Sequence, residues 1–167
     1  MSLRRLPVRG LLLALVAACS AACARRAAPA VADDCTASTP LVPGAPGSPG
    51  NLIPSELHPE GASELATLMR AMEADLKVAR AALARGDAVA AMHARHRRIR
   101  CAWPTSPEDR HGGFDALAQG YLARVRALDA APTSRAAYAG VLAGCRACHE
   151  ASCPGPLAAI DALTLAE

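Results

Sequence analysis

Apolar side chains recur three and four positions apart from about residue 63 onward, which is the spacing that places them on one face of an α-helix. The clearest stripe begins after Ser63, a good N-cap, and ends before Gly86, a typical helix-terminating residue. Its members are Leu65, Leu68, Met69, Met72, Leu76, Ala79 and Leu83. Charged residues flank the stripe, so we expect a long helix with its apolar face against a core.

Three further stripes predict three more helices. Asp87 is a suitable N-cap for the second, Pro132 ends the third, and Thr133 or Ser134 caps the fourth, which stops at Pro154. The stripes are Val89, Met92, His96 and Ile99; Phe114, Leu117, Tyr121, Val125 and Leu128; and Tyr138, Val141, Leu142 and Cys145. Four amphipathic helices with short connections predict an all-α protein, an antiparallel four-helix bundle.

The N-terminal third has no helical period. Residues 1–18 place arginines before a short apolar run, the order of a secretory signal peptide, and the run is too short to span a membrane. It ends at Cys19 in a pattern that resembles a bacterial lipobox, so Cys19 is the candidate for lipidation, with Cys23 the weaker one and plain secretion the alternative. Residues 19–56 are rich in proline and glycine and predict a flexible tether, which leaves residues 57–167 as the helical domain.

Composition and charge narrow the possible functions. The chain has one Trp, two Tyr and one Phe, a poor supply for a conventional apolar core. Three of its 18 basic residues lie in the expected signal, and without them 15 basic residues face 15 acidic ones. This balance does not indicate a nucleic-acid partner.

The motif that carries chemistry is Cys145-Arg146-Ala147-Cys148-His149. Its C-x-x-C-H spacing is the pattern of covalent c-type haem attachment. Two thiols one helical turn apart can add to the two vinyl groups of a haem, and the adjacent imidazole can then bind the iron. We therefore predict one covalent haem c, held by Cys145 and Cys148, with His149 as the proximal iron ligand. Such a group would also supply the flat apolar surface that the chain lacks.

A four-helix bundle with C-x-x-C-H near its C-terminal end resembles the class II cytochromes c, the cytochrome c′ family and its low-spin relatives. The resemblance covers roughly residues 60–153. It implies a haem attached on the C-terminal helix and a distal side shaped by the first helix. The chain departs from the family at Ser152 and Cys153, where an aromatic and a basic residue are usual, and at Leu65, where the family often has an arginine.

On this resemblance the first helix supplies the distal ligand or the group that blocks it. Met69 is the preferred candidate, and Met72 on the same stripe is the alternative. Thioethers on a helical stripe can equally be core filler. His96 is a further alternative, because it stands where an apolar residue is expected, although a hydrogen-bonded core role would also explain it.

The resulting expectation is a periplasmic one-electron carrier. No constellation of acid, base or nucleophile accompanies the motif, so we do not expect an enzyme. Its partners would be redox proteins in the periplasm or at the membrane, with a lipid anchor as tether. A five-coordinate binder of small gases such as NO or CO is the alternative. A zinc site of Cys145, Cys148, His149 and Cys153 is a second, less favoured one.

Three cysteines remain outside the signal and the motif. An oxidising compartment favours a disulfide between two of them. We expect Cys101–Cys153, which would join the loop after the second helix to the end of the fourth. A bridge that uses Cys35 is the alternative.

Overall fold

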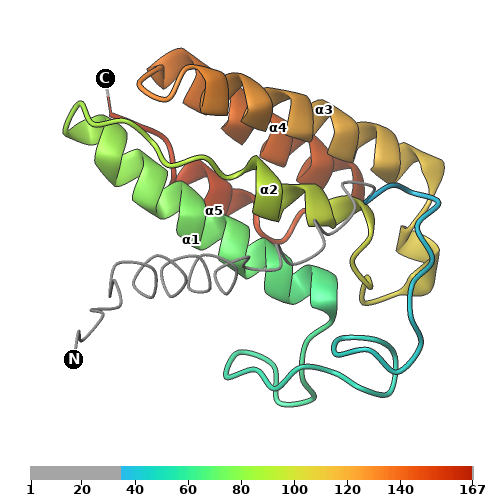
Figure 1. The fold of residues 1–167 in the computed structure, drawn as a ribbon. Coiled ribbons are helices and arrows are strands. Elements are labelled where there is room, and N and C mark those ends of the chain that lie inside the picture. The colour runs from blue at the N-terminus through green and yellow to red at the C-terminus, as the bar shows by residue number, and fades with distance from the viewer. Residues whose placement is uncertain (1–34, 167) are drawn as a thin grey trace, which may run out of the picture. The chain divides into compact units, whose positions relative to one another are not determined.

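The computed structural model describes residues 35–166, and in this range the secondary structure is helical, without a strand (Figure 1). The expected signal peptide at residues 1–18 and the lipidation candidates Cys19 and Cys23 lie outside the described residues. The elements are α1 (Glu64–Ala84), α2 (His93–His96), η2 (Arg97–Arg100), η3 (Pro107–Asp109), α3 (Gly112–Ala130), α4 (Arg135–Ser152) and α5 (Leu157–Asp161). The all-α fold class is confirmed.

The three long helices begin at side-chain caps. The Ser63 hydroxyl accepts a hydrogen bond from the Ala66 amide at 3.1 Å in α1, and Ser134 does the same for the Ala137 amide at 3.0 Å in α4. Such caps satisfy amides that have no partner within the first helical turn. Gly86 follows the C-cap residue of α1, Arg85, and its φ of 80° lies in the left-handed region that glycine adopts without strain. These starts and this end agree with the sequence pattern.

The expected second helix is wrong in its length. Only His93–His96 are α-helical, and Arg97–Arg100 form a 3-10 turn. The preceding residues are drawn into contacts with α3 instead, because the Asp129 carboxylate accepts hydrogen bonds from the Met92 and His93 amides, each at 3.0 Å. The Val89 amide donates to the Pro132 carbonyl at 2.9 Å. Tertiary hydrogen bonds therefore replace the first turns of this helix.

The core lies between α1, α3, α4 and the C-terminal segment. Helix α3 packs most closely on α4, and Gly144 permits this, because a Cβ there would lie 3.3 Å from the Tyr121 Cα. The Tyr138 hydroxyl lies 3.2 Å from the Leu76 carbonyl and 2.9 Å from the Leu163 carbonyl, so it joins α4 to α1 and to the chain end. The largest side chains with almost no exposure are Tyr121, Tyr138, Leu128 and His96.

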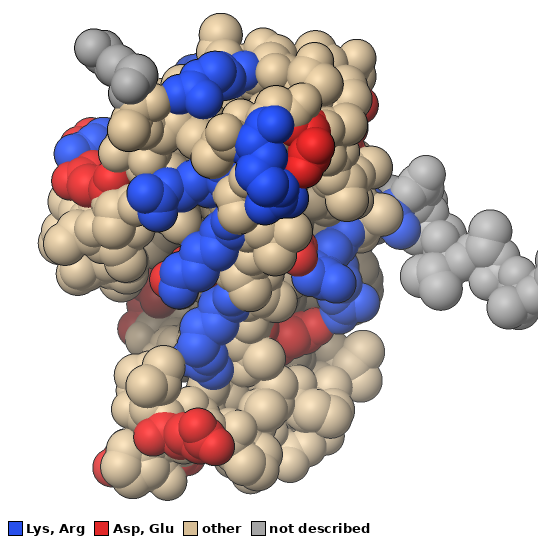
Figure 2. Space-filling view, turned by 90° about the vertical axis from the view of Figure 1, so that its left-hand side faces the viewer, with Lys and Arg blue, Asp and Glu red and all other residues tan. Residues whose placement is uncertain are grey.

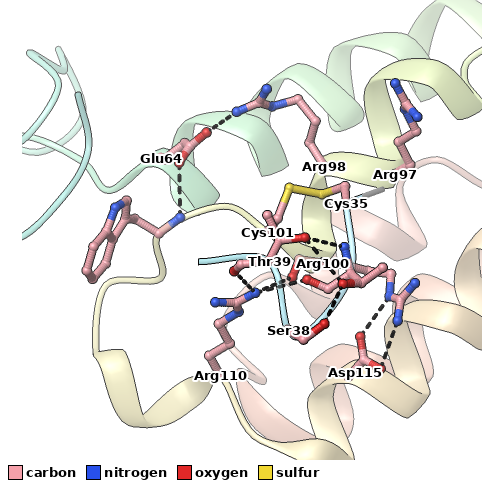
Figure 3. Close-up of a disulfide and its surroundings, with 12 residues drawn as sticks. Cys35, Ser38, Thr39, Glu64, Arg97, Arg98, Arg100, Cys101, Arg110 and Asp115 are labelled. Atoms are coloured by element: carbon pink, nitrogen blue, oxygen red, sulfur yellow. Dashed lines mark hydrogen bonds and ion pairs between the residues drawn. A yellow bond between two sulfur atoms is a disulfide. The ribbon is translucent and has the colours of Figure 1, made fainter. Parts of the chain in front are cut away.

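The segment before α1 is attached to the helical domain, which corrects two expectations. Cys101 is bonded to Cys35 (Figure 3). The expected Cys101–Cys153 bridge is therefore absent, and Cys153 has a free, exposed thiol. The part of the expected flexible tether from residue 35 to 56 folds back onto the helices. The Trp103 indole donates to the Val42 carbonyl at 2.9 Å. Gly47 lies so close to α1 that an added Cβ would clash with Glu64.

Arginine side chains fasten this segment and offset the basic run of residues 95–100. The Arg110 guanidinium donates to the carbonyls of Thr36 and Thr39 at 3.0 and 2.7 Å (Figure 3). Three arginines of the basic run form ion pairs with acids of α1 and α3, namely Arg95–Asp75, Arg98–Glu64 and Arg100–Asp115. Figure 2 shows a face on which acidic side chains lie beside several basic ones. Among the described helices, none combines the length and apolar character that a membrane span needs.

Removal of the disulfide should lower the stability of the folded protein. Cys35 and Cys101 are 66 positions apart, so their bond closes a long loop and restricts the unfolded chain. Replacing both by serine is expected to lower the free energy of unfolding by about 2–4 kcal/mol, measured by urea denaturation. The matched control is Cys153→Ser, which removes an exposed thiol and should change stability by less than about 0.5 kcal/mol. Equal stability of the double variant and the wild type would contradict the structure.

Candidate functional site

The C-x-x-C-H motif lies in the last two turns of α4. Residues at positions i, i+3 and i+4 share one face of a helix, so Cys145, Cys148 and His149 point the same way. All three are partly buried, and both cysteines are free thiols. The helix ends at Ser152, with Cys153 as its C-cap, because Pro154 follows and cannot continue the hydrogen-bond pattern.

Two hollows border this face. The larger, of about 440 Å³, is lined by Cys145 and His149, and the smaller, of about 190 Å³, by Cys148 and His149. Both are also lined by Met69 from α1 and by Cys153, so they adjoin along His149 and Met69. The larger hollow has the size of an ordinary ligand site. Its other walls are largely apolar and include Leu76, Ile160 and Leu163.

His149 is held in the form that binds a metal. Its Nδ1 atom lies 2.9 Å from the Cys153 carbonyl oxygen. A carbonyl only accepts hydrogen bonds, so Nδ1 carries the proton and Nε2 keeps a free lone pair. Histidines that bind metals commonly donate their other ring N–H to a carbonyl in this way. Together with the two thiols and the apolar hollow, this contact makes the residues of the site fit a covalently bound haem.

The two motif thiols differ in their surroundings. Burial, followed by the nearby charge of Cys148, raises the pKa of the Cys145 thiol to about 12, while a hydrogen bond from the Tyr121 hydroxyl acts in the opposite direction. Burial alone raises the pKa of Cys148. Because the thiolate is the reactive form, the raised pKa values make both thiols less reactive than an ordinary cysteine near neutral pH.

The three candidates for the distal iron ligand differ in how many of the two hollows they line. Met69 is partly buried and lines both hollows, as His149 does. Met72 is only 4% exposed and lines the larger hollow but not the smaller one. His96 lines neither hollow. Both of its ring nitrogens are occupied, Nδ1 by the Tyr121 hydroxyl at 2.7 Å and Nε2 by Asp75 at 3.1 Å. The alternative of His96 as iron ligand therefore has no support, and a hydrogen-bonded core role accounts for it.

Sequence reasoning missed the wall that the C-terminal segment supplies. Ile160 and Leu163 line the larger hollow and are buried, and the Arg146–Asp161 ion pair, at 2.8 Å, holds α5 against α4. The apolar residues after Pro156 were the only signal, and a run so short does not indicate where it packs.

The proposed zinc arrangement is not formed. Within residues 35–166, no group of three or more His, Cys, Asp or Glu side chains is placed to hold a metal ion. His149 contacts Cys153 through the backbone carbonyl of that residue. A haem iron has a different requirement, because its porphyrin supplies four ligands and the protein only one or two.

Comparison with known proteins returned no relative: the chain matches no protein-family model, no curated protein and no solved structure. The case for a haem site therefore depends on the motif and on the contacts around it. The resemblance to the class II cytochromes c enters only as part of the proposal below.

The surroundings of the thiols predict an order of chemical labelling in the folded, haem-free chain. Iodoacetamide at about pH 8 should modify the exposed Cys153 first and Cys145 last. A pKa of about 12 in place of 9.0 leaves Cys145 about a thousandfold less thiolate than an ordinary cysteine. Peptide mass spectrometry over time measures the order, and unfolding in urea should abolish it. Equal labelling of Cys145 and Cys153 in the folded chain would contradict this description.

Proposed function

We propose that this chain is an exported monohaem c-type cytochrome that carries single electrons. The observation that carries the proposal is the common face of Cys145, Cys148 and His149 on α4, which borders hollows that Met69 of α1 also lines. The two cysteines would hold the haem through thioether bonds and His149 would bind its iron. Met69 would be the sixth ligand, because it is the methionine that lines both hollows.

The residues around the site each have a task in this function. The carbonyl of Cys153 orients the His149 ring and keeps Nε2 available. Leu76, Ile160 and Leu163 exclude water from the larger hollow. The bound haem would supply a centre that gains and loses one electron. A methionine and histidine ligand pair raises the reduction potential of such a centre.

The proposal includes a distant kinship with the class II cytochromes c, with α1, α3 and α4 as long helices of an antiparallel bundle. Support comes from the place of the motif on α4 and from the contribution of α1 to both hollows, as the resemblance implies for the distal side. We further propose a periplasmic location, lipid attachment at Cys19 and redox proteins as partners. The ion-paired arginines of residues 95–100 do not support a nucleic-acid partner.

An absorption spectrum of the protein matured with haem tests this function. Wild-type protein should retain haem after denaturation and show low-spin iron. Met69→Leu keeps the side-chain volume but removes the sulfur ligand, so it should give high-spin iron that binds CO promptly. The matched control is Met92→Leu, a buried methionine that lines neither hollow, and its spectrum should equal that of the wild type.

The outcomes separate the alternatives. Haem that is released by denaturation, or no haem at all, would overturn the proposal. A wild-type protein that is already high-spin and binds CO would replace the electron carrier by a gas-binding protein. A low-spin spectrum that survives Met69→Leu would transfer the ligand role to Met72.

A further inference from the structure

The larger hollow is lined by an arginine whose charge has no acidic partner among residues 35–166. Arg70 of α1 is partly buried in the wall of this hollow. Within the same range its side chain forms one hydrogen bond, to the Thr67 hydroxyl at 3.2 Å. A guanidinium carries five N–H donors, so most of the hydrogen-bonding capacity of Arg70 is unused.

The acids of α1 do not neutralise Arg70, because each of them pairs with another base. The ion pairs are Glu64–Arg98, Glu73–Lys77 and Asp75–Arg95. Glu73 is the informative case, since it also lines the hollow and lies three positions from Arg70, a spacing at which opposite charges commonly pair. It contacts Lys77 instead, at 2.7 Å. A partly buried charge without a counter-charge is costly, so Arg70 is suited to an anionic ligand.

The hollow is apolar where it is buried and polar where it is open. Its buried walls include Leu76, Ile160 and Leu163. On the solvent side it is lined by exposed residues such as His58, and the exposure of Arg70 is intermediate between the two groups. A ligand that matches this arrangement has an apolar body and an anionic end.

A haem has both parts. Its vinyl groups lie on one edge of the ring, and two propionates, which are ionised near neutral pH, lie on the opposite edge. If Cys145 and Cys148 hold the vinyl edge at α4, the propionate edge is the one turned away from the cysteines. Helix α1 supplies Arg70 to the same hollow that Cys145 lines. Arginine forms strong, charge-assisted hydrogen bonds with carboxylates.

We propose that Arg70 binds a haem propionate at the open side of the larger hollow. The inference rests on the proposed function. The contact gives the guanidinium the acidic partner that its own helix does not provide, and it gives the propionate a cation. Arg70 thereby fixes the direction in which the haem faces. It also offsets negative charge beside the iron, which favours the arrival of an electron.

Haem and haem dimethyl ester distinguish this contact from a general effect on the fold, because esterification removes the propionate charges and leaves the ring unchanged. The test uses the full chain with Cys145→Ser and Cys148→Ser, so that either compound binds without a covalent bond. Adding Arg70→Gln should weaken haem binding by about tenfold or more and leave binding of the ester within about twofold. Spectroscopic titration measures both affinities. The matched control, Arg80→Gln, alters an exposed arginine of α1 that lines neither hollow and should change neither affinity.

The protein with covalent haem gives a second measurement. Arg70→Gln should lower the reduction potential, because the propionate charge then opposes the incoming electron. Arg70→Lys keeps the charge and should retain most of the wild-type potential. The propionate bending band in the resonance Raman spectrum should shift in Arg70→Gln and stay unchanged in Arg80→Gln.

The outcomes separate this contact from the proposed function. If Arg70→Gln weakens binding of haem and of its ester equally, or leaves the propionate band of the haem-loaded protein unaltered, the contact is overturned and the cytochrome function is intact. If the serine variant takes up neither compound, the Raman band decides. A wild-type chain that acquires no covalent haem would overturn the proposed function and this inference with it.

Discussion

The arrangement of the helices depends on the two hydrogen bonds of the buried His96 imidazole. A polar ring without exposure is costly unless both nitrogens have partners, and here one partner comes from α1 and the other from α3. Helix α2 has four residues and could not persist alone. The Asp75 and Tyr121 contacts fix it between the two long helices, and Asp129 holds its first amides.

The same framework sets the place of the candidate site. Tyr121 packs on Gly144, one residue before the first cysteine of the motif, so a close contact of α3 with α4 lies beside the larger hollow. At the other wall, the Cys35–Cys101 disulfide and the contacts of residues 35–62 secure the start of α1, which carries Met69 one and a half turns later. The C-terminal segment closes the remaining side through Ile160 and Leu163.

A core so poor in aromatic side chains explains why polar contacts take structural roles. The Tyr138 hydroxyl reaches carbonyls of α1 and of the chain end, and the Tyr121 hydroxyl reaches His96.

Much of the fold and the chemistry can be derived from the residues alone. Helical spacing and local capping residues locate α1, α3 and α4, because those signals act within a few positions. The C-x-x-C-H spacing places two thiols and an imidazole on one face of any helix that contains it. The preference for Met69 follows from its stripe together with a resemblance.

Other features were decided by contacts between residues far apart in the chain. The tertiary structure shortened α2, because Asp129 and Pro132 compete for amides that the local sequence would leave to a helix. The tertiary structure also determined that Cys101 bonds to Cys35. It placed His96 in hydrogen-bonding distance of Asp75 and Tyr121. It also brought the C-terminal segment to the larger hollow. Periodicity describes one face of one helix. Which groups meet across two faces depends on packing, and packing becomes defined only when the whole domain is folded.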